Sequence, residues 1–299
     1  MNQEQSFAPA QSTRPNCIPS GSIDPDFYNE YGYCHLRPQC SEFLGNIERA
    51  AAAFEDAMRT CVDEPFVFGF GNKDGKYRQL RYVHLRVPAF LNLMCSKEVQ
   101  TIVNQVFGRQ RMYVTHSKVS YKEVGQDLPW YPHQDNAYKR SHNLGLKDGM
   151  TIAVFLEDAD VGNGTIQVFP GSHKLKDLPH SKSNDIATDA GQLHIEHLPD
   201  IEPEHVIAKK GDLLAFGFDL IHQSSSNMSH GYRPVFLIEI KPHEGLPMDE
   251  RGRCPLILNG RLSHFQQVAY FVATRLRQIR AGFGVLRRFG LSSARSRNA

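Results

Sequence analysis

The stretch HVIAKKGDLLAFGFDLIHQ, residues 205–223, indicates the fold class because short apolar runs in it are interrupted by turn residues. Similar runs occur elsewhere in the second half of the chain, among them RMYVTHSKVSYKEV, MTIAVFLEDA and RPVFLIEIKP. β-Branched and aromatic residues favour strands, and signals such as GNG, PGS and KKGD favour the turns between them. No helical pattern separates these runs after about residue 111. We therefore expect an antiparallel sandwich or barrel.

The N-terminal third has a helical pattern instead. In SEFLGNIERAAAAFEDAMRTCV, residues 41–62, apolar side chains recur every three or four positions, and Ser41 can cap the helix. The stretch PAFLNLMCSKEVQTIVNQVFG predicts one or two further helices that end at Gly108. The sequence thus predicts a mainly β protein with flanking helices, with one domain over residues 23–245.

The two ends of the chain differ from this domain in composition. Residues 1–22 are rich in Pro, Ser, Gln and Asn, and they predict a flexible N-terminal tail without the apolar core of a secretory signal. Residues 246–299 predict a helical, basic extension whose last part contains many arginines. Such a surface could contact an anionic partner, and a basic helix packed on the body of the protein is the alternative.

Bulk composition narrows the function class. The 299 residues include 22% charged and 40% apolar side chains, as in ordinary globular proteins. A formal net charge of +2 gives no electrostatic field that favours nucleic-acid binding. The sequence contains no run of 18 apolar residues, which a transmembrane helix would need. The six cysteines lack CxxC spacing, which favours free thiols in a reducing compartment. We expect a cytoplasmic protein, and the sequence does not indicate its oligomeric state.

PWYPHQDNAY, residues 129–138, places His133 and Asp135 two positions apart. Residues at this spacing point to the same face of an extended strand, whereas Gln134 faces the other way. An imidazole and a carboxylate buried together need polar partners, so the pair is either a solvated turn or two ligands of a metal. His222, at the end of the apolar run, is a candidate third ligand. Two histidines and one carboxylate around an open site favour non-haem Fe(II).

Arg233 lies eleven residues after His222 and begins the next apolar run. A hairpin-like return would bring it beside His222. A keto acid that chelates the metal at one end needs a fixed counter-charge for its distal carboxylate. The planar fork of Arg suits this role better than the ammonium of Lys, because it can bind a carboxylate through two hydrogen bonds.

Three blocks, PHQDNAY, NGTIQVFPGSHK and GDLLAFGFDLIHQSSSN with RPVF, together resemble the phytanoyl-CoA dioxygenase family of Fe(II)/2-oxoglutarate-dependent oxygenases. The resemblance covers roughly residues 23–245. It implies a double-stranded β-helix (jelly-roll, cupin-like) core, with O2 and 2-oxoglutarate as co-substrates. By residue-by-residue match, it implies that the iron ligands are His133, Asp135 and His222. The same match implies that Arg233 anchors the distal carboxylate of 2-oxoglutarate.

Further residues are candidates for the co-substrate site. Ser224 matches a hydroxyl that often assists the Arg anchor in the family, or it belongs to a simple turn. Lys118 and Lys122 share one face of a strand and could reach 2-oxoglutarate, and an exposed strand face is the alternative. Thr151 could donate its hydroxyl to the same molecule.

The wall of the substrate pocket is less clearly marked. Trp130 and Tyr138 flank the predicted ligands and could line this pocket or belong to the core. Gln134 is a further candidate for substrate contact, although it points away from the ligands and reaches the site at most through a neighbour. We expect the polar stretch 174–205 to be a solvated loop that shapes the pocket.

The sequence therefore predicts an Fe(II)/2-oxoglutarate-dependent dioxygenase that hydroxylates an unactivated C–H bond, with natural-product tailoring as one setting. The same iron site could serve demethylation, desaturation, ring or endoperoxide formation, or phytanoyl-CoA-like acyl hydroxylation. Halogenation is disfavoured because Asp135 occupies the place that halogenating relatives leave to chloride. A non-catalytic jelly-roll binding protein is the alternative from a different class, and four intact ligand-type residues argue against it.

Overall fold

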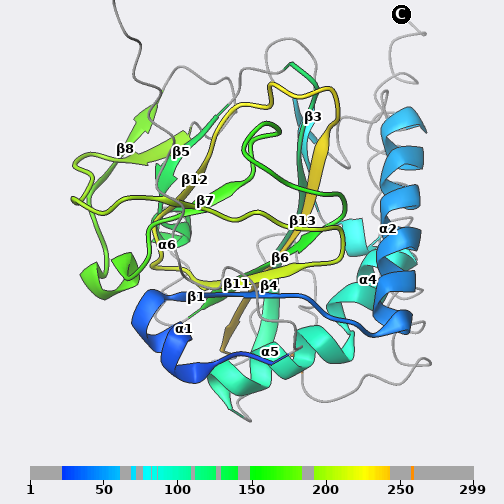
Figure 1. Cartoon of the computed structure of the whole chain (residues 1–299), viewed down its shortest axis with the longest axis horizontal. Helices are drawn as coiled ribbons and strands as arrows, with labels where there is room; N and C mark the ends of the chain where they lie inside the picture. Colours follow the sequence, from blue (N-terminus) through cyan, green and yellow to red (C-terminus); the bar gives the residue numbers. More distant parts are fainter. Residues whose placement is uncertain are drawn as a thin grey trace, which may run out of the picture.

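The protein consists of two facing β-sheets with helices on the outer side of the larger sheet (Figure 1). The computed structural model describes residues 22–60, 69–71, 77–81, 83–85, 87–108, 112–125, 129–140, 149–183, 192–242 and 257–258. The predicted tail lies outside these residues except for Ser22. Most of the predicted C-terminal extension lies outside them as well.

The described helices are α1 (Pro25–Tyr31), α2 (Ser41–Thr60), α4 (Pro88–Met94), α5 (Lys97–Phe107) and α6 (Asp135–Arg140), with 3-10 helices η1 (Val83–Leu85) and η2 (Ser172–Leu175). The predicted helical stretches correspond to α2, α4 and α5, whereas α6 and η2 were not expected. Asp24 caps α1 by accepting from the backbone amides of Asp26 and Phe27, and Ser96 caps α5 by accepting from the amide of Val99. The N-terminal helical predictions are confirmed, and no helix in the described part of the chain is long and apolar enough to cross a membrane.

The larger sheet is antiparallel throughout. In spatial order its strands are β1 (Tyr33–Leu36), β11 (Leu213–Gly217), β6 (Met150–Phe155), β13 (Arg233–Pro242), β4 (Met112–Lys122), β3 (Tyr77–Arg81) and β2 (Gly69–Gly71). A further strand, β14 (Ile257–Leu258), pairs with β4. The sequence analysis expected helix there. That expectation is wrong at these two residues, because they complete a sheet edge whose partner is more than 100 positions earlier in the chain.

The smaller sheet faces the inner side of the larger one. Its strands are β10 (Glu204–His205), β7 (Ile166–Val168), β12 (His222–Ser224) and β5 (Trp130–His133). The apolar side chains between the sheets include Phe155, Val168, Leu214, Phe216 and Val235. The predicted antiparallel sandwich with flanking helices is therefore confirmed.

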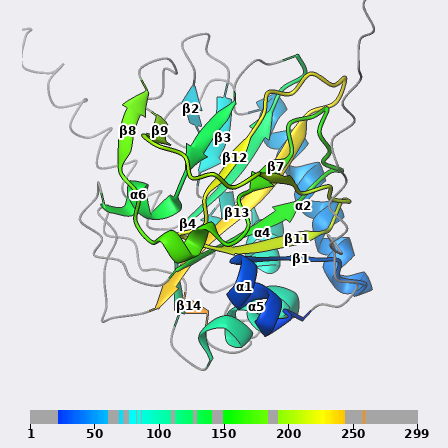
Figure 2. The same cartoon turned by 60° about the vertical axis from the view of Figure 1, so that its left-hand side comes forward.

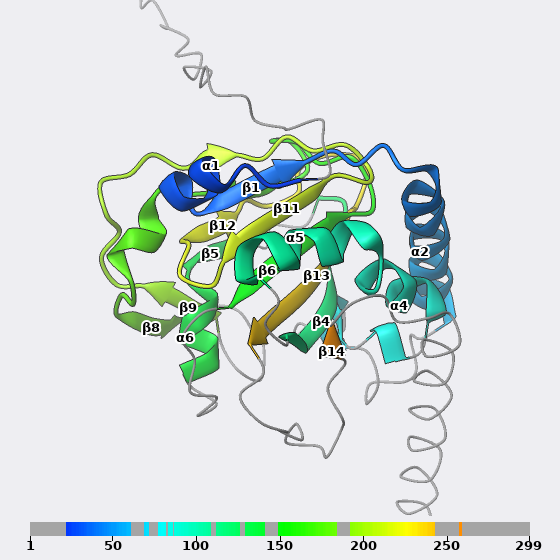
Figure 3. The ribbon, with the colours of Figure 1, turned by 90° about the horizontal axis from the view of Figure 1, so that it is seen from below.

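Helices cover the opposite side of the larger sheet (Figure 3). Phe54 of α2 packs on Tyr121 with ring centroids 5.6 Å apart, and Phe90 of α4 packs on Phe236 at 4.8 Å. Because side chains alternate along this part of β4 and Tyr121 faces the helices, Lys118 and Lys122 face the space between the sheets.

A two-stranded hairpin stands beside α6 at one edge of the sandwich (Figure 2). Its strands are β8 (His180–Ser183) and β9 (Gln192–Ile195). The hairpin lies within the stretch 174–205, which the sequence analysis expected to be a solvated loop. That expectation is wrong for β8 and β9, because the side chains of His180 in β8 and Gln192 in β9 accept from the backbone amides of Gln134 and Tyr131.

Candidate metal centre

Strand pairing brings two histidines from distant parts of the chain together. His133 ends β5 and His222 begins β12, and the two residues are direct partners in the register of these antiparallel strands. Directly opposed residues project to the same face of a sheet. Their ring centroids are accordingly 4.3 Å apart.

Asp135 completes a group of three potential ligands. Its Oδ1 lies 4.0 Å from Nε2 of His133 and 3.8 Å from Nε2 of His222. The three ligand atoms all lie within 4.8 Å of one another, and no other such group of three occurs among the described residues. The expectation that His133 and Asp135 share one extended strand is wrong in detail. β5 ends at His133 and α6 begins at Asp135, so a strand-to-helix turn directs the carboxylate toward the imidazoles.

Backbone carbonyls hold both imidazole rings in one orientation. Nδ1 of His133 lies 2.6 Å from the carbonyl oxygen of Tyr131, and Nδ1 of His222 lies 3.1 Å from that of Leu220. A carbonyl can only accept, so each Nδ1 carries a proton and each Nε2 is the ring nitrogen turned toward Asp135. This arrangement of two imidazole nitrogens and one carboxylate oxygen fits a divalent transition metal.

The protonation states also suit metal binding. Burial and the neighbouring His222 lower the pKa of His133 to about 3, although Asp135 opposes the shift. Burial alone would raise the pKa of Asp135, but His222, Lys118 and His133 lower it well below its usual range. At neutral pH, His133 is therefore a neutral imidazole and Asp135 is an ionised carboxylate, which are the forms that bind a metal ion.

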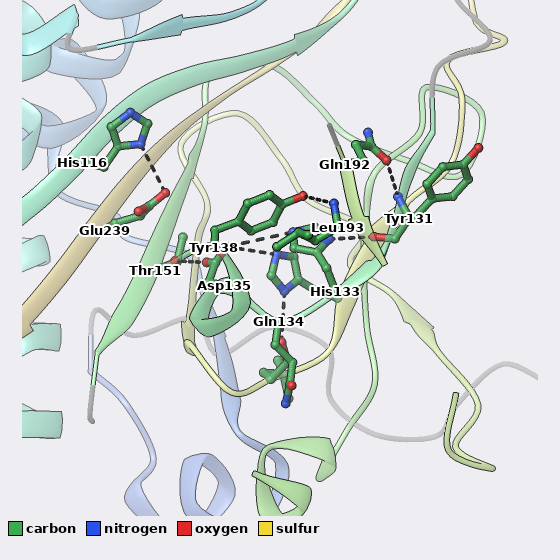
Figure 4. Close-up of polar contacts among 12 residues, drawn as sticks. His116, Tyr131, His133, Gln134, Asp135, Tyr138, Thr151, Gln192, Leu193 and Glu239 are labelled. Atoms are coloured by element: carbon green, nitrogen blue, oxygen red, sulfur yellow. Dashed lines mark hydrogen bonds and ion pairs between the residues drawn. The ribbon is translucent and has the colours of Figure 1, made fainter. Parts of the chain in front are cut away.

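Thr151 and Tyr138 support the ligands (Figure 4). The hydroxyl of Thr151 donates to Oδ2 of Asp135 at 2.5 Å, which leaves Oδ1 facing the two imidazoles. The ring of Tyr138 meets that of His133 edge to face at 5.4 Å, and its hydroxyl accepts from the amide of Leu193 in β9. The predicted candidates Thr151 and Tyr138 therefore lie at the triad.

Two predicted substrate-binding residues are placed differently. Trp130 begins β5, is half-buried and pairs with Ser224 of β12. Gln134 is fully buried and points away from the triad, and its side chain binds backbone groups instead (Figure 4). The structure does not bring Gln134 to the face on which the ligands meet.

A second cluster of predicted residues lies at one end of the inner face. Lys122 and Arg233 are direct partners on β4 and β13, and their exposed fractions are 1% and 2%. Burial lowers the pKa of Arg233 to about 10, so it remains a cation at neutral pH. Its Nε has no hydrogen-bond partner among the described residues. A buried guanidinium with an unpartnered Nε favours an anion, and Lys122 lies directly beside it on β4.

The segment that follows Ser224 approaches this cationic pair. A Cβ added to Gly164 would lie 2.4 Å from the carbonyl oxygen of Ser225 and 3.1 Å from Cδ of Lys122. Gly164 also has a φ of +73°, which other residues rarely adopt. Its missing side chain therefore lets the end of β12 and the stem of Lys122 converge.

Lys118 occupies a different part of the inner face. Its Nζ lies 3.0 Å from Oε1 of Glu239, and Nδ1 of His116 lies 3.4 Å from the same oxygen. Four residues along a strand separate Lys118 from Lys122, which corresponds to about 13 Å. The sequence analysis missed Glu239, although a single acidic residue inside the apolar run RPVFLIEIKP was an available signal.

Comparison with known proteins gives a consistent result. The model of the phytanoyl-CoA dioxygenase family matches residues 28–235. Phytanoyl-CoA dioxygenase 1 of Oryza sativa subsp. japonica is 31% identical and covers 76% of this chain and 92% of its own length. A phytanoyl-CoA dioxygenase of Arabidopsis thaliana is 28% identical, with 76% and 91% covered. L-proline trans-4-hydroxylase of Streptomyces griseoviridis is 29% identical, but the match covers only 52% of this chain and 60% of the hydroxylase.

Solved structures show the same fold. EctD from S. alaskensis, with 2-oxoglutarate and 5-hydroxyectoine, superimposes with a TM-score of 0.60 at 14% identity over 74% of this chain and 76% of that one. The 2-oxoglutarate-dependent carbocyclase SnoK from nogalamycin biosynthesis superimposes with a TM-score of 0.55 at 19% identity over 82% and 96%. The predicted jelly-roll core is thereby confirmed.

Proposed function

Because the chain belongs to the phytanoyl-CoA dioxygenase family of Fe(II)/2-oxoglutarate-dependent oxygenases, we propose that it hydroxylates an unactivated C–H bond of a small molecule. In this reaction 2-oxoglutarate is converted to succinate and CO2. The observation that carries the proposal is the convergence of His133, Asp135 and His222 with their ligand atoms turned toward one another. The hydroxylase and dioxygenase relatives support the reaction type.

His133, Asp135 and His222 would hold the iron through Nε2, Oδ1 and Nε2. When bound, Fe(II) activates dioxygen, with 2-oxoglutarate as the second source of electrons. The carbonyls of Tyr131 and Leu220 accept from the Nδ1–H groups and thereby hold both imidazole rings in orientation. Three protein ligands leave coordination positions for the co-substrates.

Arg233 and Lys122 would bind the distal carboxylate of 2-oxoglutarate. Both side chains are buried, and the two residues are direct partners in the register of β13 and β4. The guanidinium can form two parallel hydrogen bonds to a carboxylate, and the ammonium adds a second charge. Ser224, which is 5% exposed, would add its hydroxyl from the end of β12.

The remaining candidates have supporting roles in this proposal. Thr151 orients Asp135, and Lys118 adds positive charge near that carboxylate while it is paired with Glu239. Tyr138, whose ring meets that of His133, and Trp130, which lies in the same strand as His133, would form part of the wall against which the primary substrate packs. A small molecule with the size of a free amino acid or a similar metabolite is the class of substrate to test first, since a hydroxylase of L-proline is among the relatives.

The test is 2-oxoglutarate turnover measured as succinate release from Fe(II)-loaded protein across a panel of small molecules, with mass spectrometry of the products. We expect one compound class to gain 16 mass units in step with succinate formation. His222→Ala should abolish this turnover, whereas His197→Ala, which removes an exposed histidine outside the triad, should not. Full turnover in His222→Ala would contradict the proposal.

A further inference from the structure

Gln134, the residue between two of the three proposed ligands, has a structural role of its own. We propose that Gln134 is a positioning residue that holds the His133–Asp135 segment at a set distance from His222. The inference rests on the proposed function, because it assigns the residues on either side of Gln134 to a metal. Gln134 would act on the metal centre through the backbone that it binds on the side away from the ligands, without contact to metal or substrate.

The side-chain amide of Gln134 forms three hydrogen bonds, and all three go to backbone groups. Nε2 donates to the carbonyls of Lys176 and Asp219 at 2.6 and 2.7 Å. Oε1 accepts from the amide of Leu178 at 2.9 Å. The side chain has no exposed surface, so water does not replace these bonds. Only a neutral side-chain amide supplies two donors and one acceptor in this arrangement.

The bond to Asp219 connects the two ligand-bearing segments. Asp219 lies in the turn between β11 and β12, three residues before His222. Asn136 binds the same turn, since its backbone amide donates to the carbonyl of Phe218 at 3.2 Å and its side chain donates to the carboxylate of Asp219. Residues of the segment 133–136 thus alternate, with His133 and Asp135 facing the centre and Gln134 and Asn136 facing the turn. Because Gln134 and Asn136 bind the turn that precedes His222, the position of His222 depends on the positions of His133 and Asp135.

The bond to Lys176 involves a strained backbone. Lys176 has φ +58° and ψ −145°, and it is the one non-glycine residue with positive φ in the described part of the chain. A non-glycine residue keeps such a conformation only where its surroundings hold it. The Gln134 amide binds the carbonyl of Lys176, and the backbone amide of Gln134 donates to Nε2 of His180 in β8. Residues 176–180 therefore wrap around Gln134 and hold it in place.

Two variants and a control test this role. Gln134→Met keeps the length of the side chain and removes all three side-chain hydrogen bonds. Gln134→Glu keeps the acceptor for Leu178 and replaces the two donors. The control Gln100→Met also removes a buried glutamine, whose Nε2 donates to the carbonyl of Cys95 at the end of α4. Thermal unfolding by circular dichroism would show that each variant is folded, and Gln134→Glu serves if Gln134→Met is insoluble.

The measurement is a Co(II) titration under anaerobic conditions, followed by the visible absorption of the bound metal. Residues that orient metal ligands typically contribute about 10- to 100-fold to metal affinity. We expect both Gln134 variants to bind Co(II) about 10- to 100-fold more weakly and with a changed visible spectrum, because the ligand geometry relaxes. Gln100→Met should lower thermal stability while its affinity and spectrum stay those of the wild type.

The outcomes separate this inference from the proposed function. If the wild type binds Co(II) and a folded Gln134 variant has the same dissociation constant and spectrum, Gln134 is not a positioning residue and the proposed function is unaffected. An equal loss of affinity in Gln100→Met would also overturn the inference, since the effect would then reflect general destabilisation. If neither the wild type nor Gln100→Met binds Co(II), the metal centre itself is refuted.

Discussion

Lys122 and Arg233 are directly paired on neighbouring strands, and both side chains are almost fully buried on the inner face of the larger sheet. Burying the Arg233 guanidinium costs free energy unless an anion binds it, and its Nε has no hydrogen-bond partner among the described residues. A cation of this kind is not expected in a sandwich whose interior serves only as a core. The buried guanidinium also leads to the first prediction.

Arg233→Lys is expected to raise the KM for 2-oxoglutarate more than it lowers kcat. The variant retains the charge but loses the planar fork, and a hydrogen bond to a charged group contributes about 1.5–3 kcal/mol, or roughly 10- to 150-fold in affinity. Steady-state kinetics with varied 2-oxoglutarate would measure the split. An unchanged KM in the variant would remove Arg233 from the co-substrate site.

Thr151→Val should weaken metal binding while the protein stays folded. The change removes the hydroxyl that donates to Oδ2 of Asp135 and keeps the branched shape. We expect about a 10- to 100-fold rise in the metal dissociation constant, measured by Co(II) titration. Thr151→Ser, which retains the hydroxyl, is the matched control and should bind nearly as the wild type does. Equal binding by all three proteins would show that this hydrogen bond does not matter for the centre.

Asp212 should make stability depend on pH in the acid range. Although burial works to raise its pKa, hydrogen bonds from Arg37 and His35 lower it to about 2. Since the pKa of the folded state lies below that of the unfolded state, the stabilisation is fully present above about pH 4. It is lost as the pH falls from about 4 to 2.

Urea unfolding of the wild type and Asp212→Asn across pH 2–6 would measure this effect. The difference in unfolding free energy between the two proteins should shrink by on the order of 1–2 kcal/mol as the pH falls from 5 to 2. The lower value applies if solvent screens the ion pair between Asp212 and the half-exposed Arg37. A difference that is constant over this range would show that the carboxylate is not held in its ionised form by these partners.

Lys176→Gly is expected to stabilise the protein. Glycine adopts φ +58° without the backbone strain of about 1–3 kcal/mol that Lys176 has there. A glycine loses more conformational entropy on folding than other residues, which offsets only about 0.5–1 kcal/mol of that gain. The Tm should rise by about 2–4 °C per kcal/mol in a protein of this size. Metal affinity should be unchanged, because Gln134 binds the backbone carbonyl and not the Lys176 side chain. A lower Tm would mean that the backbone at Lys176 is not strained.

The sequence by itself was sufficient to predict the mainly β fold and the proposed metal ligands. His133 and Asp135 stand two apart in a polar motif with aromatic neighbours, and His222 ends an apolar run. The HxD pair alone is a weak signal, and it was the three blocks that together resemble one family that made these residues strong candidates. Arg233 was found in the same way, by the chemistry of its guanidinium and its place at the start of a strand.

Only the tertiary structure determined how these residues are held. The pairing of His133 with His222 and of Lys122 with Arg233 depends on strand register, which is set by packing between sheets and leaves no local pattern. The bonds of Gln134 go to backbone carbonyls and amides more than 40 residues away. Every residue has such backbone groups, so the sequence cannot mark which of them a side chain will bind. The folded chain selects them by bringing the turn at Asp219 and the strained backbone at Lys176 behind the metal ligands.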